Sequence, residues 1–244
     1  MRRVVIFGAG SAIAQSFARR LAPEGARFYL VARNETALDD MANDLLARGA
    51  QEVSVRAADL SDVDGLAGLC DLARNALGGI DIALVAHGVL PEQAECEASS
   101  ERLRDVMMIN ALSPMTLLTQ LGRIMAEQRT GALAVLSSVA GDRGRPSNYV
   151  YGASKAALSV MAEGLSLSLA GKGVDVLVIK PGFVDTPMTA SFRKGLLWSS
   201  ADRIALVILN AIKKRRRGVV YAPGWWRLIM LAIKFAPGFL VRRL

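Results

Sequence analysis

Near the start of the chain, a short apolar run leads directly into a glycine turn: Val4-Val-Ile-Phe-Gly-Ala-Gly-Ser-Ala-Ile-Ala14. The first four residues favour a buried β-strand, and the residues from Ser11 onward have the period of an amphipathic helix. A glycine turn between a strand and a helix directs backbone N–H groups toward a phosphate. Because Ala12 and Ala14 stand where such turns often have glycine, the stretch alone is equally consistent with a packing turn.

Beyond this turn, apolar runs rich in β-branched residues alternate with longer segments of helical period. Strands are predicted over seven ranges: 4–7, 27–31, 52–56, 80–86, 133–136, 174–180 and 218–221. Helices are predicted between them: 11–22, 35–48, 61–77, 101–128, 149–171 and 201–216. The alternation predicts an α/β fold of Rossmann type, a doubly wound parallel sheet of seven strands with helices on both faces.

The chain of 244 residues shows no repeat or linker, so we expect one domain. Within it, residues 1–222 would form the Rossmann part and residues 223–244 a basic, apolar C-terminal segment with an amphipathic helix. Arg227 and Lys234 interrupt the most apolar stretch, so we expect no membrane-spanning helix. The run at residues 4–7 is too short for the core of a signal peptide.

Composition excludes several classes of protein. With 52% hydrophobic and 21% charged residues, the chain is neither disordered nor collagen-like. Cys70 and Cys96 have neither metal nor redox spacing, and His87 is the only histidine, so we expect a reduced, cytoplasmic protein without a metal site. The net charge of +8 comes from the C-terminal part, where 12 Lys and Arg residues and one acid follow Phe192. Because the basic run at 213–217 adjoins tryptophans and aliphatic residues, we expect no nucleic-acid partner.

A tyrosine and a lysine, Tyr151 and Lys155, lie four residues apart in a helical pattern and therefore project from one face of the helix. A phenol has a pKa near 10, and a neighbouring ammonium group stabilises the phenolate. We therefore expect Lys155 to lower the pKa of Tyr151 and make it a usable general acid and base.

The motif Tyr151-Gly-Ala-Ser-Lys155, with Ser138 thirteen residues earlier, resembles the short-chain dehydrogenase/reductase family. Four further matches occur in family order: the turn at Gly8, Asp59-Leu60, Asn110, and Pro181-Gly-Phe-Val-Asp-Thr186. The resemblance extends over residues 1–222. It implies a nicotinamide cofactor and the reduction of a carbonyl group to a hydroxyl group.

The resemblance implies a catalytic set of Asn110, Ser138, Tyr151 and Lys155. Tyr151 would donate a proton to the carbonyl oxygen, and Ser138 would hold that oxygen. Lys155 would bind the nicotinamide ribose, and Asn110 would hold a water that links Lys155 to solvent.

The resemblance also implies which residues bind the cofactor. They lie at the predicted carboxyl ends of strands or just beyond them: Gly8, Gly10, Ser11, Ile13, Arg33, Asn34, Asp59, Leu60, Ala86, His87, Gly88, Tyr151, Lys155, Pro181, Val184 and Thr186. Val184 and Thr186 would hold the carboxamide. His87 stands where the family usually has asparagine, and we expect it to pack beside the ribose without acting in catalysis.

The second strand ends at Ala32, where NAD-binding proteins have a carboxylate that binds the adenosine ribose. Arg33 could instead pair with the 2′-phosphate of NADP, and Asn34 could add a neutral donor. The sequence therefore predicts NADP(H), although Arg33 could also be a surface arginine.

The C-terminal segment is the least determined part of the sequence. It combines two tryptophans, Trp225 and Trp226, and a following apolar stretch with basic residues at 213–217, 242 and 243. Such a segment suits contact with a membrane surface, with a partner subunit or with the substrate cleft. Residues 186–200 would form an apolar lid with two cations. This part of the chain is similar to the decaprenylphosphoryl-2-keto-ribose reductases, which implies a lipid-linked keto-sugar substrate.

Three functions stay open at this point. The first is an NADPH-dependent reductase of a lipid-linked or other hydrophobic carbonyl compound, placed in the cytoplasm or at the inner face of the membrane. The second is a soluble ketoacyl- or steroid-type reductase whose tail builds an oligomer, and the third is a non-catalytic NADPH-binding protein. A homo-oligomer, dimer or tetramer, is expected.

Overall fold

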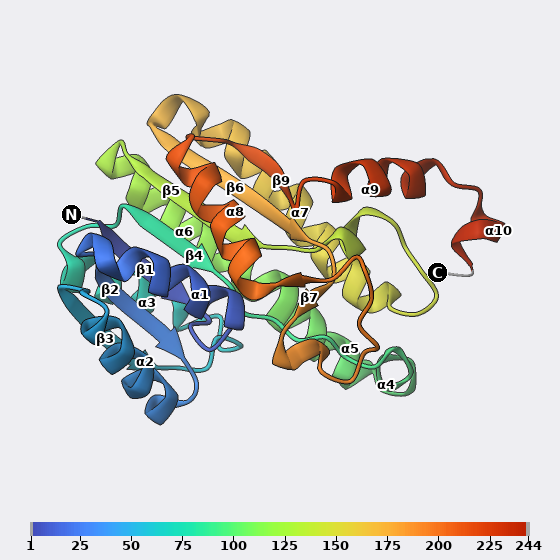
Figure 1. The fold of residues 1–244 in the computed structure, drawn as a ribbon, viewed down its shortest axis with the longest axis horizontal. Helices are drawn as coiled ribbons and strands as arrows, with labels where there is room; N and C mark the ends of the chain where they lie inside the picture. Colours follow the sequence, from blue (N-terminus) through green and yellow to red (C-terminus); the bar gives the residue numbers. More distant parts are fainter. Residues whose placement is uncertain (1, 243–244) are drawn as a thin grey trace.

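The centre of the protein, described here over residues 2–242 by a computed structural model, is one parallel sheet. Its seven strands follow the order β3-β2-β1-β4-β5-β6-β9, and every neighbouring pair is parallel (Figure 1). They are β1 (Arg3–Phe7), β2 (Arg27–Ala32), β3 (Glu52–Ala57), β4 (Ile82–Val85), β5 (Gly131–Leu136), β6 (Val174–Pro181) and β9 (Gly218–Ala222). The predicted Rossmann-type fold is confirmed.

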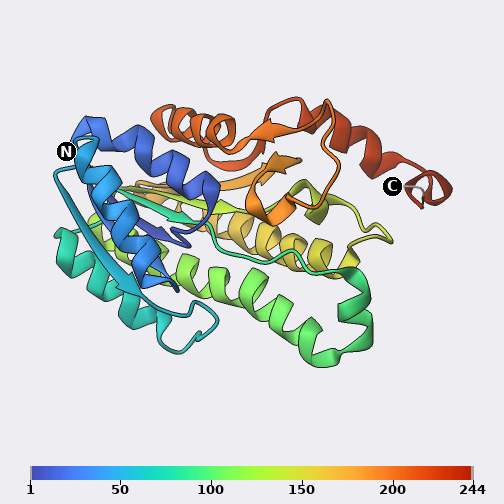
Figure 2. The ribbon, with the colours of Figure 1, turned by 60° about the horizontal axis from the view of Figure 1, so that its bottom comes forward.

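Helices cover both faces of the sheet (Figure 2). Along β1 the side chains alternate, so that Val4 and Ile6 pack into one apolar layer while Val5 and Phe7 pack into the other. The first layer holds α1 (Ala12–Leu21), α2 (Glu35–Ala47) and α8 (Ala201–Lys213). The second holds α3 (Leu66–Leu77), α6 (Ser113–Gln128) and α7 (Tyr149–Leu169).

The strand order reverses between β1 and β4, and their carboxyl ends meet at this point. Such a switch point opens the crevice in which α/β sheets bind ligands. Gly8, which follows β1, has a φ of +85°, and a Cβ there would lie 2.5 Å from the backbone nitrogen of His87. Only glycine allows the turn and the close approach together.

The helix predicted at 101–128 is divided in the structure. It consists of α5 (Ser100–Met107), a π-helical turn η2 (Met108–Leu112) and α6. The helix predicted at 61–77 begins only at Leu66, and that predicted at 201–216 ends at Lys213. Helix α4 (Gln93–Ala98), which precedes α5, was not predicted.

Two smaller parts lie beyond the carboxyl edge of the sheet. Strands β7 (Val184–Asp185) and β8 (Ser199–Ser200) pair in parallel and anchor both ends of the intervening segment, which contains the turn η5 (Pro187–Thr189). The predicted C-terminal helix is α9 (Trp226–Phe235), followed by α10 (Gly238–Val241). Arg243 and Leu244 lie outside the described residues. Within residues 2–242, no helix is both long and apolar enough to cross a bilayer.

Candidate active site

Tyr151 and Lys155 lie together on the first turns of α7, as their spacing predicts. Lys155 Nζ is 5.9 Å from the centroid of the Tyr151 ring and donates to the carbonyl oxygen of Leu136 over 3.0 Å. Only 4% of Lys155 is exposed. A buried ammonium without a carboxylate partner is costly, which makes this group a candidate for function.

Ser138 follows β5 and is the N-cap of the short turn η3 (Val139–Asp142). Its hydroxyl oxygen accepts a hydrogen bond from the backbone N–H of Ala140 over 3.1 Å. That bond uses only an acceptor site, so the Ser138 O–H can still donate, and in the protein alone it interacts with the Tyr151 phenol. Its predicted role of holding a carbonyl oxygen beside Tyr151 stays a prediction.

The acid–base properties of the pair differ from the expectation. Burial lowers the pKa of Lys155 to about 8. Burial also raises the pKa of Tyr151, while a hydrogen bond from Ser138 and the charge of Arg145 oppose that rise. The prediction that Lys155 lowers the pKa of Tyr151 is therefore wrong for the protein alone, because desolvation of the phenolate dominates. The phenol stays protonated at neutral pH, as a proton donor must.

Asn110 is fully buried in the π-helical turn η2. Its side chain accepts from the backbone N–H of Val89 over 2.7 Å and donates to the carbonyl oxygen of Val89 over 2.8 Å. A Cβ on Gly88 would lie 2.9 Å from Asn110 Oδ1 and 3.3 Å from Lys155 Nζ, so this glycine lets both groups approach. Asn110 thus holds the chain after β4 beside Lys155, and the water it would bind stays a prediction.

His87 lies at the carboxyl end of β4 and is neutral. Burial and the nearby Lys155 charge lower its pKa to about 3. The Ser113 hydroxyl donates to the carbonyl oxygen of Leu60, so it accepts from His87 Nε2–H over 2.8 Å, and this network assigns the tautomer. No described residue pairs with the buried Nδ1. A fixed neutral imidazole fits the predicted packing role rather than proton transfer.

The turn after β1 has the properties of a phosphate-binding loop. Gly10 has open space where a Cβ would stand, and Ser11 makes no side-chain capping bond to α1. Ser11 therefore does not occupy the first N–H groups of α1, and no acidic residue stands in that turn. Ile13 and Ala86 are buried in the same apolar cluster as Ala9 of the turn. These residues fit the pyrophosphate of a dinucleotide.

Arg33 and its neighbours lie at the end of β2. Arg33 is exposed and, among residues 2–242, has no carboxylate within ion-pair distance, although its charge helps to lower the pKa of Asp59. Asn34 caps α2 by accepting from the N–H of Ala37 over 3.0 Å, which leaves its amide NH2 free. Asp59 accepts from the N–H and hydroxyl of Ser61, both over 2.9 Å, and Leu60 is buried. Arg33 is thus placed to meet an added negative charge.

The predicted carboxamide-binding residues follow β6. Pro181 ends that strand, Val184 begins β7, and Thr186 lies between β7 and the turn η5. The Val184 carbonyl oxygen accepts from the Thr189 hydroxyl over 2.6 Å, and the Thr186 N–H donates to the same hydroxyl over 3.2 Å. These bonds fix the turn at the carboxyl edge of the sheet.

Arg145 is a site residue that the sequence did not reveal. It lies in the loop between η3 and α7, its Nε is buried without a hydrogen-bond partner among the described residues, and its charge acts on the Tyr151 pKa. Its own pKa is lowered by burial. A loop has no periodic pattern, and the only signal in the sequence is the pair of basic residues in Arg143-Gly-Arg145, four residues before Tyr149.

Helix α9 covers the site with one face. Trp226 is 3% exposed and packs with Met230 on Val139, while its ring meets the Phe183 ring edge-on at 5.5 Å. The Arg203 guanidinium lies 4.4 Å from the centroid of the Trp225 ring. Both tryptophans thus take part in packing within the chain, while contact of this segment with a membrane or a partner subunit stays a prediction.

The predicted lid, residues 186–200, has an apolar outer surface. Trp198 stacks on Phe183 with centroids 5.5 Å apart, and Lys194 pairs with Asp185 over 2.6 Å. Four of its apolar side chains are exposed: Met188, Phe192, Leu196 and Leu197.

The basic run at 213–217 lies away from the apolar surface of the lid and α9. It precedes β9, at the amino edge of the sheet, whereas α9 follows the carboxyl end of β9. Lys213 pairs with Glu24 over 3.2 Å, and Arg215 and Arg217 both pair with Asp175, over 2.9 Å and 2.6 Å. The basic run and α9 thus lie at opposite edges of the sheet, so residues 213–242 do not form one continuous basic, apolar surface.

Comparison with known proteins gives concordant results. A family model described as short chain dehydrogenase matches residues 2–196. An uncharacterized oxidoreductase of Mycobacterium tuberculosis is 37% identical over 99% of this chain and 96% of its own length. Another from Streptomyces coelicolor is 35% identical over 100% of this chain and 96% of its own length. Neither name states a substrate, so the similarity to decaprenylphosphoryl-2-keto-ribose reductases stays a prediction.

Solved structures share the fold. Levodione reductase has a TM-score of 0.82 and 25% identity, over 93% of this chain and 98% of its own. A variant of actinorhodin polyketide ketoreductase, solved with NADPH, has a TM-score of 0.79 and 23% identity, over 91% of this chain and 97% of its own.

Proposed function

The chain belongs to the short-chain dehydrogenase family, and on this premise we propose that it is an NADPH-dependent reductase that converts a carbonyl group to a hydroxyl group. One observation carries the proposal. Buried Lys155 lies 5.9 Å from the centroid of the Tyr151 ring, and the Ser138 hydroxyl, which can donate a hydrogen bond, lies beside the Tyr151 phenol. This is the arrangement needed to hold a carbonyl oxygen and protonate it.

The residues of this chain would divide the work as follows. NADPH, when bound, supplies a hydride for the carbonyl carbon. The Ser138 O–H donates to the carbonyl oxygen and the Tyr151 phenol transfers its proton to it. Lys155 would donate to the nicotinamide ribose and place a positive charge near the phenolate that forms. The uncapped start of α1 and the turn at Gly8 would hold the pyrophosphate.

The preference for NADPH rests on Arg33. A guanidinium group that is exposed and free of carboxylate partners within residues 2–242 can bind the 2′-phosphate, and Ala32 offers no carboxylate to repel it.

A hydrophobic, lipid-linked carbonyl compound is the proposed substrate class. The exposed apolar side chains of the lid lie at the carboxyl edge of the sheet, where the catalytic residues also lie. The outer face of α9 adds exposed Leu228, Leu231 and Phe235. Such a surface suits an amphiphile that enters from a membrane, and the sequence similarity favours a keto-sugar carried on a polyprenyl phosphate.

The same surface supports a peripheral position at the cytoplasmic face of a membrane, with α9 and α10 in contact with lipid. Buried, unpaired Cys70 and Cys96 suit a reducing compartment. Val160 and Leu167 on α7 are 73% and 81% exposed and offer a surface for the proposed homo-oligomer. Light scattering of the purified protein would measure its subunit number.

A cofactor-oxidation screen tests the proposed function. Initial rates with NADPH and NADH would be compared across keto-sugars, polyprenyl-phosphate keto-sugars and ketoacyl thioesters. Oxidation of NADPH that depends on one of these compounds is expected. Lack of any carbonyl-dependent oxidation with either cofactor would refute the reductase, and faster reaction with NADH would refute the role of Arg33.

A further inference from the structure

The turn η3, which has Ser138 as its N-cap, lies between two helices. On one side, a Cβ on Gly141 would lie 2.8 Å from backbone atoms of α7, so the turn lies directly against that helix. On the other side, Val139 is buried in an apolar cluster with Trp226 and Met230 of α9. Because Val139 directly follows Ser138 in the chain, its contact with α9 bears on where the Ser138 hydroxyl lies.

Trp226 also contacts the segment that follows β6. A Cβ on Gly182 would overlap the Trp226 ring, so this position has room for a glycine only. The ring of the next residue, Phe183, meets the Trp226 ring edge-on. Gly182 lies between Pro181 and Val184, which are both predicted to bind the cofactor. One buried side chain therefore touches the segments after β5 and after β6, at the carboxyl edge of the sheet.

Packing holds the Trp226 ring in this position. The residue is 3% exposed, and among the described residues its Nε1 has no hydrogen-bond partner. Another aromatic ring would therefore preserve most of these contacts, whereas an aliphatic side chain would leave a gap beside Val139. The ring thus acts on Val139 and Gly182 through its shape.

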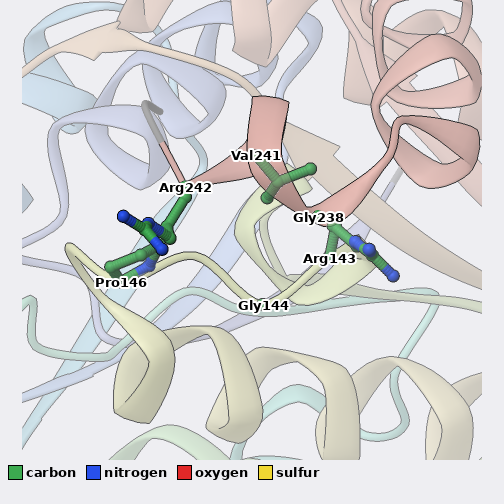
Figure 3. A pocket seen from close by; sticks show the side chains of 6 residues that line it. All are labelled: Arg143, Gly144, Pro146, Gly238, Val241 and Arg242. Carbon is green, nitrogen blue, oxygen red and sulfur yellow. The ribbon is translucent and has the colours of Figure 1, made fainter.

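The end of the C-terminal segment is less closely packed on this region than α9 is. Between α10 and the loop after η3 lies a pocket of about 280 Å³, in which the side chains of Arg143 and Arg242 point apart (Figure 3). Between α9 and η3, in contrast, Val139, Trp226 and Met230 are 6%, 3% and 0% exposed. The close contact of the C-terminal segment with η3 is therefore made by α9.

We propose that Trp226 is a positioning residue, which holds the turn that carries Ser138 through Val139 and the segment after β6 through Gly182. A gap beside Val139 would allow the turn to shift, because packed side chains fill most of such a space only by moving. A displacement of a reacting group by about 1 Å costs up to about 10²-fold in rate. The effect on turnover rests on the proposed function, whereas the placement of the Ser138 hydroxyl can be measured in the protein alone.

A double-mutant cycle tests the coupling between Trp226 and Ser138. The readout is the resonance of the Tyr151 Cζ carbon in protein made with isotope-labelled tyrosine, because this carbon carries the phenolic oxygen beside which the Ser138 hydroxyl lies. The chain has four tyrosines, so Tyr151→Phe assigns the resonance. Ser138→Ala should shift the resonance in the wild type. In a Trp226→Leu background, where the hydroxyl is held less firmly, Ser138→Ala should cause less than about half of that shift.

Three further backgrounds separate positioning from a general loss of stability. Trp226→Phe keeps an aromatic ring and should keep the full effect of Ser138→Ala. Gly182→Ala keeps the tryptophan but displaces its ring, so it should act like Trp226→Leu, and it decides the test if Trp226→Leu does not fold. Leu45→Ala removes a buried side chain of α2, near the opposite edge of the sheet. It should lower the stability measured by urea unfolding and keep the full effect of Ser138→Ala.

A full Ser138→Ala shift in the Trp226→Leu or the Gly182→Ala background would overturn the proposal. The absence of a shift in the wild type, or an equal loss in the Leu45→Ala background, would also overturn it. With a carbonyl compound that the wild type reduces, Trp226→Leu should lower kcat by about tenfold or more and change KM by less than about threefold. A wild type that shows the expected cycle but reduces no carbonyl compound would refute only the proposed function.

Discussion

At the scale of single residues, two opposing effects meet at the phenol of Tyr151. Burial disfavours the phenolate and raises the pKa, while the Ser138 hydroxyl and the Arg145 charge lower it. Burial is the largest effect, so the protein without cofactor holds the phenol in its protonated form. Lys155, with a pKa lowered to about 8, would lose its positive charge at moderately alkaline pH.

Replacement of Arg145 tests this balance. Arg145→Met removes a cation that favours the phenolate, so the pKa of Tyr151 should rise further. Because alcohol oxidation needs the phenolate, the alkaline rise of kcat/KM for oxidation should move to higher pH. Arg104→Met, on exposed α5, is the matched control and should leave the profile unchanged. A profile of Arg145→Met that stays in place or moves to lower pH would show that Arg145 does not act on the phenol.

Replacement of Arg33 tests the choice of cofactor. Arg33→Gln removes the charge proposed to bind the 2′-phosphate, so KM for NADPH should rise by about tenfold or more. KM for NADH, which lacks that phosphate, should change little. An equal rise for both cofactors would mean that Arg33 only supports the loop, and no rise for either would leave it a surface arginine.

The sequence identified the reacting side chains more readily than their properties. Spacing alone puts Tyr151 and Lys155 on one helix face, because a helix fixes the relation of residues four apart. The direction of the Tyr151 pKa shift depends on which groups cover it after folding. No local pattern around Tyr151 contains that information, and Arg145 was missed because a loop has no period.

At the scale of elements, a buried charged cluster joins three parts of the structure beside the site. Asp142 in η3 binds Lys180 in β6 and Tyr221 in β9. The side chains of Asp142 and Lys180 are 1% and 6% exposed. Two of these elements, η3 and β9, form the edge on which α9 packs.

Breaking this pair should destabilise the protein. Asp142→Asn leaves the buried Lys180 ammonium with only the longer, 3.7 Å contact to the exposed Glu163 carboxylate, and breaking a buried pair costs about 3–5 kcal/mol of unfolding free energy. Asp185→Asn removes an exposed pair with Lys194 and should cost at most about 1 kcal/mol. Urea unfolding of both variants measures the difference. Equal stability of the two variants would mean that the cluster contributes no more than a surface pair.

Element types could be predicted from the sequence, but their interruptions could not. The strands could be recognised because strands that are buried on both faces appear in the sequence as continuous apolar runs. Residues 82–85 and 176–179 are two such runs, and both are fully buried strands. The residues of the π-helical turn around Asn110 follow the same helical pattern as the helices beside it, so nothing in the local sequence marks the interruption. Its position is tied to hydrogen bonds between Asn110 and Val89, which are distant in the chain.

At the scale of the whole molecule, α9 and the lid place exposed apolar side chains at one edge of the sheet. Helix α9 places Trp226 and Met230 inward on Val139, and it leaves Leu228 and Phe235 72% and 82% exposed. The lid adds further exposed apolar side chains at the same edge of the sheet. Because α9 shields the core beside the site, removal of residues 223–244 would expose buried surface and would be a poor test of membrane binding.

Substitutions on the outer face of α9 test the membrane proposal without opening the core. Leu228→Ser, Leu231→Ser and Phe235→Ser together should weaken flotation with anionic vesicles by about tenfold or more, because lipid binding scales with buried apolar area. The control combines Leu46→Ser, Leu72→Ser and Leu206→Ser, which are exposed on helices away from α9. Equal flotation by both triple variants would remove membrane binding through α9.

The most direct measurement of the central claim is turnover by Tyr151→Phe, which removes only the phenolic oxygen. With a carbonyl compound that the wild type reduces, kcat should fall by about 10²–10⁴-fold, because the proton donor is lost. NADPH affinity, measured by fluorescence titration, should stay close to the wild-type value, since the ring still packs over Lys155. A variant that keeps turnover within a few-fold of the wild type would contradict the account, because the proton would then have to come from another group.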